Sequence, residues 1–200
     1  IPGVLATFTS VENLTGGTDD DAFVLADGVG LSGAIDGGGN TLGDLLNYSA
    51  YTTGVVINLS TGMSTNIAGG VSNIENATGG SEADTITGNA TDNLLTGGLG
   101  ADTIQGLAGE DTINGGAGND MLDGGADDDT LNGGLGDDTF KFSNNYGMDT
   151  VNEAGGEGND IMDFSMVTVP LTITIASVTV DDSGGNVATH AANNIESVVG

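Results

Sequence analysis

A nine-residue unit repeats without a gap through the middle of this 200-residue chain. From residue 79 to residue 141 the units are GGSEADTIT, GNATDNLLT, GGLGADTIQ, GLAGEDTIN, GGAGNDMLD, GGADDDTLN and GGLGDDTFK. The sixth position of every unit is Asp or Asn. The eighth position is always apolar, with Ile86, Leu95, Ile104, Ile113, Leu122, Leu131 and Phe140. Seven apolar residues in register predict a buried row, so the period is structural.

Each unit is expected to form a six-residue turn, Gly-Gly-x-Gly-x-Asp, followed by a three-residue strand. Glycine suits the turn because its backbone adopts positive φ and approaches other atoms closely. The apolar residue of the strand points inward, and its two neighbours point outward. Two units would close one coil of eighteen residues, so that residue n stacks on residue n+18 at about 4.8 Å. The repeat therefore predicts an all-β fold, a parallel β-roll or β-solenoid.

The same rhythm continues more loosely on both sides of the repeats. The looser copies are GGTDDDAFV (16–24), GGGNTLGDLLN (37–47), NNYGMDTVN (144–152) and GGEGNDIMD (155–163). Thr53–Leu59 and Val167–Val180 predict strands, and Leu42–Tyr48 is the only weak helix candidate. We expect degenerate solenoid repeats and connecting strands over 1–78, seven regular repeats over 79–141, and looser repeats with terminal strands over 142–200.

The eighteen-residue stacking predicts columns of carboxylates. Asp84, Asp102, Asp120 and Asp138 fall in one column, and Asp111 and Asp129 fall below Asn93 on the opposite edge. Two charges about 4.8 Å apart repel by roughly 3.5 kcal/mol at an effective dielectric of about 20, so several such pairs would rival a domain's net stability of about 5–15 kcal/mol. A cation between the turns removes this penalty. Carboxylate and carbonyl oxygens without nitrogen or sulfur ligands suit Ca²⁺ better than Mg²⁺.

The units resemble the RTX (hemolysin-type calcium-binding) family, whose signature is Gly-Gly-x-Gly-x-Asp-x-U-x, where U is apolar. GGLGADTIQ, GGAGNDMLD and GGLGDDTFK match the signature in full. The resemblance implies a β-roll with several Ca²⁺ ions in its turns, type I secretion, and folding outside the cell. By position it implies carboxylate ligands at Asp84, Asp102, Asp111, Asp120, Asp129, Asp138, Asp149 and Asp160, with Asn93 in one ligand position. It also implies turn-glycine carbonyl ligands from Gly97, Gly98, Gly100, Gly115, Gly116, Gly118, Gly133, Gly134 and Gly136.

Some units depart from the signature. Glu82, Thr91 and Asp127 replace the fourth-position glycine, and Asn93 replaces the ligand Asp. Sites that touch residues 82–93 should therefore be weaker or empty. Asp127 either adds a ligand or strains its turn.

Composition excludes several functions. The chain has 29 acidic residues and a single basic one, Lys141, so nucleic acid and anionic membrane surfaces are poor partners. It has no Cys, one histidine (His190), and no stretch suited to insertion in a membrane. Paired catalytic carboxylates in 19–21 or 127–129 are disfavoured because sugar sites normally offer aromatic platforms and Trp is absent. We expect no enzyme.

Three simpler or alternative interpretations accompany these predictions. The Asp columns would, on the simplest view, be a solvated acidic face. The seventh-position Thr residues form an outward row that would suit ice binding, although Thr is also ordinary strand chemistry and Leu94 and Met121 interrupt the row. Tyr48, Tyr51 and Tyr146 are expected at edges or on the surface.

The expected function is that of a calcium-stabilised structural or adhesive segment of a large secreted bacterial extracellular protein. Its partners would be calcium and further copies of the same repeats, because stacked solenoids can associate end to end into filaments. The alternative is the C-terminal export and folding domain of a type I secreted hydrolase, a protease or lipase. A carbohydrate-binding module has no residue-level support. In each case calcium binding would supply folding energy.

Overall fold

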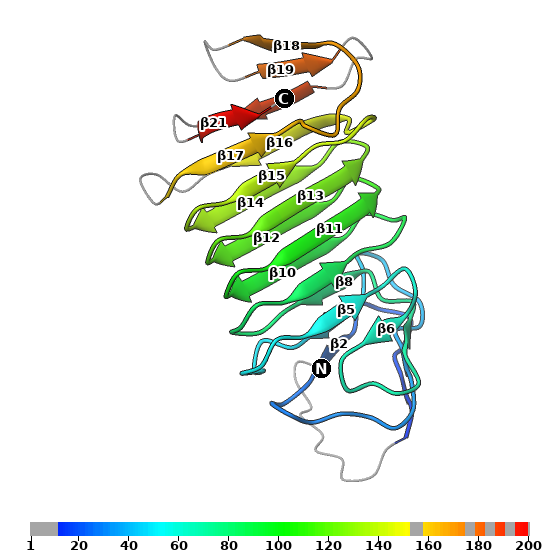
Figure 1. The fold of residues 1–200 in the computed structure, drawn as a ribbon. Helices are drawn as coiled ribbons and strands as arrows, with labels where there is room; N and C mark the ends of the chain where they lie inside the picture. The colour runs from blue at the N-terminus through cyan, green and yellow to red at the C-terminus, as the bar shows by residue number, and fades with distance from the viewer. Residues whose placement is uncertain (1–11, 153–157, 175–178, 183–186, 191–194, 200) are drawn as a thin grey trace.

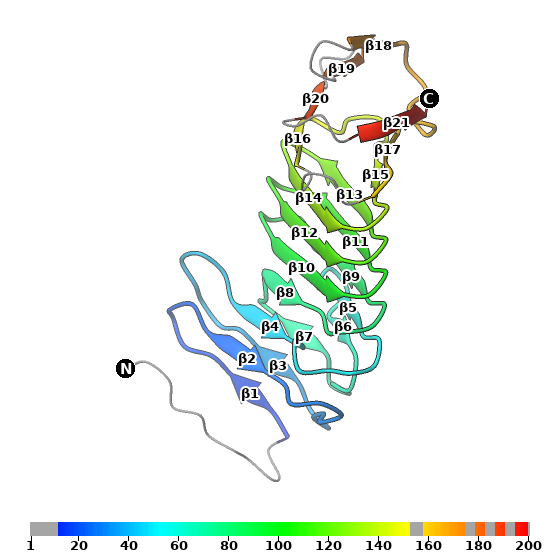
Figure 2. The ribbon, with the colours of Figure 1, turned by 90° about the vertical axis from the view of Figure 1, so that its left-hand side faces the viewer.

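The computed structural model describes residues 12–152, 158–174, 179–182, 187–190 and 195–199. In these residues the chain is all-β and winds as a solenoid whose coils stack along one axis (Figure 1 and Figure 2). A ten-stranded and an eight-stranded sheet form its two long faces, and a three-stranded sheet adds a third face at the N-terminal end. The predicted all-β parallel β-solenoid is confirmed.

The strands within each sheet follow the stacking of the coils. The ten-stranded sheet has the order β18 (Leu171–Thr174), β19 (Thr179–Asp182), β20 (Val187–His190), β16 (Met148–Asn152), β14 (Thr130–Leu135), β12 (Thr112–Ala117), β10 (Leu94–Leu99), β8 (Asn76–Thr78), β4 (Leu45–Asn47), β2 (Ala22–Val24). The eight-stranded sheet has the order β21 (Ile195–Val199), β17 (Asp160–Asp163), β15 (Thr139–Lys141), β13 (Met121–Ala126), β11 (Thr103–Ala108), β9 (Thr85–Thr87), β5 (Val56–Asn58), β6 (Met63–Ser64). The third sheet has the order β1 (Leu14–Thr15), β3 (Ile35–Asp36), β7 (Val71–Ser72).

The eighteen-residue stacking is confirmed, but the strands are longer than predicted. Ile113 pairs with Leu131 and Ile104 with Leu122, both in parallel register. Strands β10 to β14 have six residues each, because the first three residues of the next unit continue the pairing. The prediction of a six-residue turn and a three-residue strand was therefore wrong for β10 to β14, whereas β9 and β15 have the predicted three residues. Glycine explains the difference, because residues without Cβ can stack closely at positive φ, as Gly98 does on Gly116.

The looser copies form coils of the same solenoid. Strand β2 pairs with β4, β4 with β8, and β8 with β10, so the coils before residue 79 stack directly on the regular repeats. The weak helix prediction for Leu42–Tyr48 was wrong, because Leu46 in β4 joins the buried row between Phe23 and Ala77. Strand β5 confirms the Thr53–Leu59 prediction. Val167–Val180 contains β18 and the start of β19, and residues 175–178 lie outside the described part.

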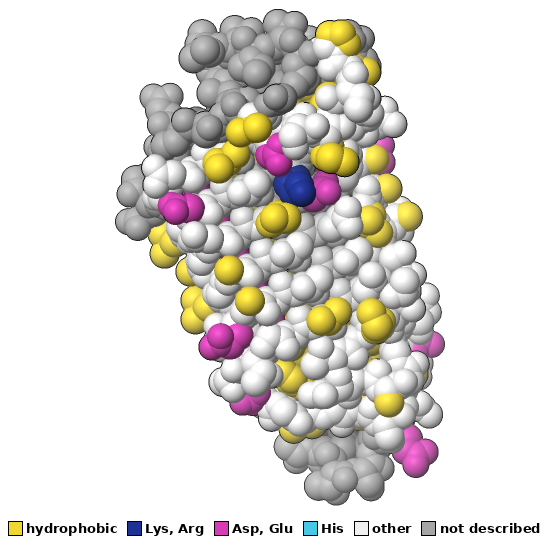
Figure 3. All heavy atoms as spheres, in the orientation of Figure 1, with side chains coloured by type: hydrophobic (Ala, Val, Ile, Leu, Met, Phe, Trp, Pro, Cys, Tyr) yellow, Lys and Arg dark blue, Asp and Glu magenta, His cyan; other side chains and the backbone are white. Residues whose placement is uncertain are grey.

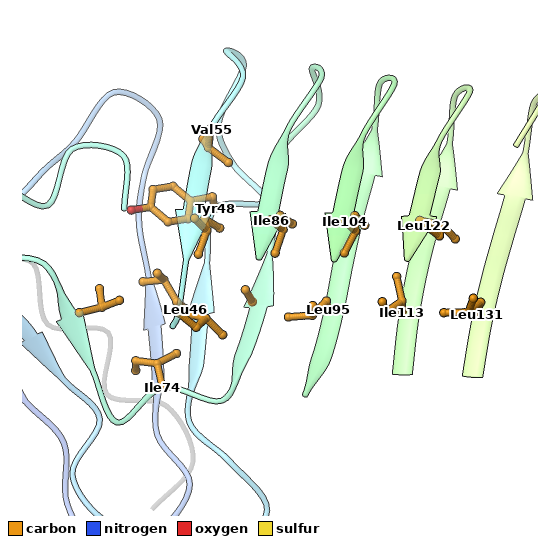
Figure 4. Close-up of a cluster of buried hydrophobic side chains, with 14 of the residues drawn as sticks. Leu46, Tyr48, Val55, Ile74, Ile86, Leu95, Ile104, Ile113, Leu122 and Leu131 are labelled. Carbon is orange, nitrogen blue, oxygen red and sulfur yellow. The ribbon is translucent and has the colours of Figure 1, made fainter. Parts of the chain in front are cut away.

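The core is a ladder of apolar side chains between the two long sheets, with one buried side chain from each of the strands β8 to β17 (Figure 4). All seven eighth-position residues of the repeats are at most 1 % exposed, as the repeat predicted. The expectation for the tyrosines was wrong, since Tyr48, Tyr51 and Tyr146 are all buried. The Tyr48 hydroxyl group donates to the Thr65 carbonyl oxygen at 2.5 Å, and Tyr146 packs edge-on against the stacked rings of Phe142 and Phe164.

The single basic side chain lies between two acidic ones. Lys141 in β15 pairs in register with Asp123 of β13 and Asp163 of β17. Burial raises the pKa of Asp123 and the charge of Lys141 opposes this rise, whereas hydrogen bonds from Ser165, together with the charge of Lys141, lower the pKa of Asp163. In Figure 3 this dark blue side chain lies among acidic side chains on a face with few other charges.

Leu107 occupies the second position of its unit, where most units have glycine. The resulting backbone strain should lower the stability of the protein by a measurable amount. It has φ of 93°, whereas the glycines at the same position of other units, such as Gly98 and Gly116, have φ of 122° and 116°. Such a backbone costs a non-glycine residue of order 1–3 kcal/mol. We expect Leu107→Gly to raise the free energy of unfolding in calcium by about 1 kcal/mol, measured by urea denaturation.

Leu99→Gly is the matched control for this substitution. Leu99 lies one position further along its unit, is 57 % exposed, and does not have positive φ. The same change there should lower stability by about 0.5–1 kcal/mol through the flexibility of glycine. Equal losses in both variants would contradict the assignment of strain to Leu107.

Candidate metal sites along the two edges of the solenoid

Carboxylates form a hydrogen-bonded column along the first edge, the turns that precede the strands of the eight-stranded sheet. The backbone N–H of Asp84 donates to Oδ1 of Asp102 at 2.7 Å, and that of Asp102 donates to Oδ1 of Asp120 at 2.8 Å. The series continues from Asp120 to Asp138 at 2.8 Å and from Asp138 to Asp160 at 2.9 Å. The predicted stacking of Asp84, Asp102, Asp120 and Asp138 is therefore confirmed, and Asp160 extends the column. Each carboxylate already uses one oxygen to hold the preceding coil.

The second edge, formed by the turns before the strands of the ten-stranded sheet, repeats this arrangement. The N–H of Asn93 donates to Oδ1 of Asp111 at 2.8 Å, and that of Asp111 donates to Oδ1 of Asp129 at 2.8 Å. Asp129 in turn donates to Oδ1 of Asp149 at 3.0 Å. The two columns thus run in parallel along opposite edges, separated by the apolar ladder.

The columns are buried, which excludes a solvated acidic face. All nine residues, from Asp84 to Asp160 on the first edge and from Asn93 to Asp149 on the second, are at most 3 % exposed. A buried carboxylate is stable only when its charge is compensated or its oxygens are hydrogen-bonded. Whether the second oxygen, Oδ2, has a hydrogen-bond partner therefore decides whether a carboxylate needs a cation.

Five buried carboxylates have a second oxygen without a partner. In the described part of the chain the buried side-chain oxygens that lack a hydrogen bond are Oδ2 of Asp102, Asp111, Asp120, Asp129 and Asp138. They belong to consecutive turns, with three on the first edge and two on the second. Buried polar atoms in folded proteins are nearly always paired, so five in one series indicate a missing ligand.

Each of three such oxygens shares a small space with a backbone carbonyl oxygen. A Cβ atom added to the first glycine of a unit would lie closer than 3.0 Å both to Oδ2 of its own Asp and to a glycine carbonyl of the next coil. The glycine, carboxylate and carbonyl residues are Gly97, Asp102 and Gly115; Gly106, Asp111 and Gly124; and Gly115, Asp120 and Gly133. Two acceptors that face one space without a donor between them fit a hard cation.

Burial strongly shifts the titration of these carboxyl groups. Loss of solvation, assisted by the charges of neighbouring carboxylates, raises the pKa of Asp102, Asp111 and Asp129 to about 7 and that of Asp138 to about 6. Burial also raises the pKa of Asp120 and Asp84, and it raises that of Asp149 to about 8. Without a cation the ionised columns are therefore unfavourable at neutral pH. A bound divalent cation would stabilise the ionised carboxylates and remove this cost.

Asp84 and Asn93, which precede the partnerless carboxylates, have no such requirement. Asp84 accepts from the N–H of Val55 at 2.7 Å through Oδ1 and from the N–H of Gly80 at 2.5 Å through Oδ2. Asn93 donates through Nδ2 to the carbonyl oxygen of Glu75 at 2.7 Å and accepts through Oδ1 from the N–H of Asn89 at 2.8 Å. Hydrogen bonds within the protein thus satisfy the side chains of Asp84 and Asn93. The carboxylates further along each column would need a cation instead.

The second column extends into coils in which the sequence predicted no site. The N–H of Asp21 donates to Oδ1 of Asp44 at 2.7 Å, and that of Asp44 donates to Oε2 of Glu75 at 3.0 Å. Asp44 is fully buried. The copies GGTDDDAFV and GGGNTLGDLLN carried a signal for Asp21 and Asp44, because each Asp precedes the strand. Nothing in the spacing pointed to Glu75.

The remaining predicted glycines line the same turns. At the second position, Gly98, Gly116 and Gly134 have φ between 112° and 122°, and at the fourth position Gly100, Gly118 and Gly136 have φ between 109° and 137°. A Cβ at Gly116 would lie closer than 3.0 Å to the carbonyl oxygen of Gly98, so a larger residue at Gly116 would force the backbone to shift. Their carbonyl groups remain proposed ligands.

The carboxylates form columns rather than clusters. Within the described residues, no three carboxylate, histidine or cysteine side chains gather around one point. A cation in these turns would consequently take many of its oxygens from backbone carbonyls, one or two carboxylates contributing the charge. Also within the described residues, no helix has the length and hydropathy needed to span a bilayer.

A parallel β-solenoid with buried carboxylates in glycine-rich turns defines a cation-stabilised structural repeat. Comparison with protein families identifies the repeat. The family model of the RTX calcium-binding nonapeptide repeat matches residues 69–104, 78–113 and 105–140. Residues 69–140 therefore carry RTX calcium-binding nonapeptide repeats, whose β-roll is a structural calcium-binding element rather than a catalytic one. No curated protein matches the chain.

Proposed function

We propose that this segment is a calcium-stabilised structural region of a large secreted bacterial protein, and that it acts outside the cell. The observation that carries the proposal is the series of five buried, partnerless Oδ2 atoms, which begins at Asp102. Calcium sites of extracellular modules bind at roughly 10⁻⁴–10⁻³ M. Sites of that affinity would stay empty in the cytoplasm and fill outside the cell, so export would precede folding.

Two extracellular roles use such a region, and we favour the first. As part of an adhesive or filament-forming array, the solenoid would act as a stiff spacer and associate end to end with further copies. As the C-terminal domain of a type I secreted hydrolase, it would serve export and folding. Further copies of the phrase Glu-Asn-x-x-Gly-Gly, present at 12–17 and 75–80, would support the array. A protease or lipase domain encoded upstream would support the hydrolase.

Calcium binding to Asp120→Ala tests the stacked sites. The carboxylate of Asp120 accepts through Oδ1 from the N–H of Asp102 in the preceding coil, and its Oδ2 shares a space with the carbonyl oxygen of Gly133 in the following coil. We expect isothermal titration calorimetry to show fewer bound ions, a midpoint at least threefold higher, and reduced cooperativity, because sites on both sides lose an oxygen.

Asp137→Ala is the control for the Asp120 variant. Asp137 lies on the same edge next to Asp138, and it is exposed. Its removal should leave the number of bound ions unchanged. An Asp120→Ala titration that superimposes on that of the unmodified protein would contradict the stacked-site arrangement.

A further inference from the structure

Asp127 occupies a backbone position that is otherwise typical of glycine. It is the fourth residue of its unit and has φ of 78°. The residues stacked on either side of it along the second edge are Gly109 and Gly147, with φ of 107° and 76°. A non-glycine residue in this conformation costs of order 1 kcal/mol or more. The position therefore carries a negative charge where the residues stacked on both sides of it carry none.

The carboxylate of Asp127 reaches toward the preceding coil. Its Oδ2 accepts from the N–H of Gly109 at 3.3 Å, a contact between two successive turns of the second edge. The turn of Gly109 contains Asp111, and the turn of Asp127 contains Asp129. Asp127 is exposed, so its charge lies on the solvent side of these two buried residues.

The two buried residues are those of the second edge whose Oδ2 atoms have no partner. Asp111 and Asp129 are 1 % and 2 % exposed. The negative charge of Asp127 lies close enough to both to add to the increase in pKa that burial causes in each. On the first edge, Gly118 and Gly136 take the fourth position and bring no such charge.

We propose that Asp127 makes the cation site between the coils of Asp111 and Asp129 the tightest of the series, so that calcium binds there first. The inference rests on the proposed function, because it requires that the turns bind calcium. Since no three carboxylates in the described residues gather around one point, Asp127 acts by adding charge at the mouth of the turn. The first ion would then clamp two coils in the middle of the regular repeats, from which order spreads to both sides.

The test compares Asp127→Asn with Asp127→Gly in the full chain. Asn removes the charge and tolerates positive φ, whereas Gly removes both the charge and the backbone strain. Calcium is titrated calorimetrically and in competition with a chromophoric chelator. In both variants we expect the affinity of the tightest step to fall about tenfold, which corresponds to about 1.4 kcal/mol. Only Asp127→Gly should also raise the stability in excess chelator.

Asp128→Asn is the matched control. Asp128 is the next residue and is also exposed, but its Oδ1 accepts from the N–H of Met148 at 2.9 Å and so faces the following coil. This variant should keep the tightest step within about twofold of the unmodified protein, a change of less than about 0.4 kcal/mol.

Two outcomes would overturn the inference about Asp127. If neither Asp127 variant weakens the tightest step, Asp127 merely strains its turn. If Asp128→Asn weakens that step as much as Asp127→Asn does, the effect is one of general charge and not of this position. A failure of the proposed function would look different, because the unmodified protein would then bind no calcium at all.

Discussion

In excess chelator, the coils that follow Asn93 are expected to lose their structure while the coils before it persist. The partnerless carboxylate oxygens begin at Asp102 on the first edge and at Asp111 on the second. Without a cation, each ionised carboxylate costs about 2–4 kcal/mol at neutral pH, from a pKa raised by two to three units. Two or three of these costs are comparable to the whole net stability of a domain, about 5–15 kcal/mol.

The coils before Asn93 have other sources of stability. Both carboxylate oxygens of Asp84 accept hydrogen bonds from backbone N–H groups, and the side chain of Asn93 is also hydrogen-bonded. The third sheet, β1–β3–β7, adds a face that the regular repeats lack. The buried hydroxyl group of Tyr48 lies 2.7 Å from Oγ of Ser64, which ties the segment around β6 to the core. None of these interactions involves an ionised carboxylate that needs a cation.

Hydrogen exchange with and without calcium measures this difference directly. With chelator we expect slow exchange to persist in β3, β4, β8 and β9, and to be lost in β10 to β16 with part of the far-ultraviolet circular dichroism of β-structure. Millimolar calcium should restore both signals. Slow exchange throughout the solenoid in chelator would show that apolar stacking suffices, and uniform loss in every strand would refute the division at Asn93.

The regular repeats could be predicted from the sequence because every level of their structure has the same period. Glycine, carboxylate and apolar residues recur together every nine positions, and two units make one coil. This period alone predicts the pairing of Ile113 with Leu131 and the column from Asp84 to Asp138. The length of the strands did not follow, because glycine is typical of turns and yet continues the parallel pairing here. At those residues the local preference of glycine favours a turn, whereas the contacts between stacked coils favour a strand.

The irregular coils could be predicted only in part. The successive residues of the second column are separated by 23 positions from Asp21 to Asp44 and by 31 from Asp44 to Glu75, so no fixed period relates them. The burial of Tyr48 depends on Ser64 and Thr65, which the chain brings back through the antiparallel strand β6. Contacts between residues so far apart in the sequence cannot be predicted from the local sequence pattern.

Asp102→Asn is expected to change stability in opposite directions with and without calcium. In chelator at pH 8 the folded form of the coils around Asp102 should be favoured by about 2–4 kcal/mol in the variant relative to the unmodified protein, so that slow exchange extends further beyond Asn93, because burial raises the pKa of Asp102 from 3.8 to about 7 and Asn carries no charge. In millimolar calcium it should be less stable, because one carboxylate oxygen of the site is lost. Hydrogen exchange in chelator and urea denaturation in calcium measure the two effects.

The pH dependence of the chelator result identifies its cause. A carboxyl group whose pKa is raised in the folded state binds protons more tightly there, so its contribution to stability is greatest below pH 3.8 and is lost as pH rises through about 7. The advantage of Asp102→Asn should therefore shrink below pH 7 and vanish near pH 3.8. An advantage that stays constant from pH 8 to pH 4 would contradict charge burial as its origin.

Asp163→Asn provides a control of opposite sign. Hydrogen bonds from the side chain and backbone of Ser165, with the nearby charge of Lys141, lower the pKa of Asp163. Removing that charge should reduce stability at neutral pH both with and without calcium. Because Asp102 and Asp163 are both acidic residues of the same solenoid, net charge alone predicts the same direction for both variants. Only the buried, partnerless oxygen of Asp102 predicts that its removal helps the metal-free protein and harms the calcium-loaded one.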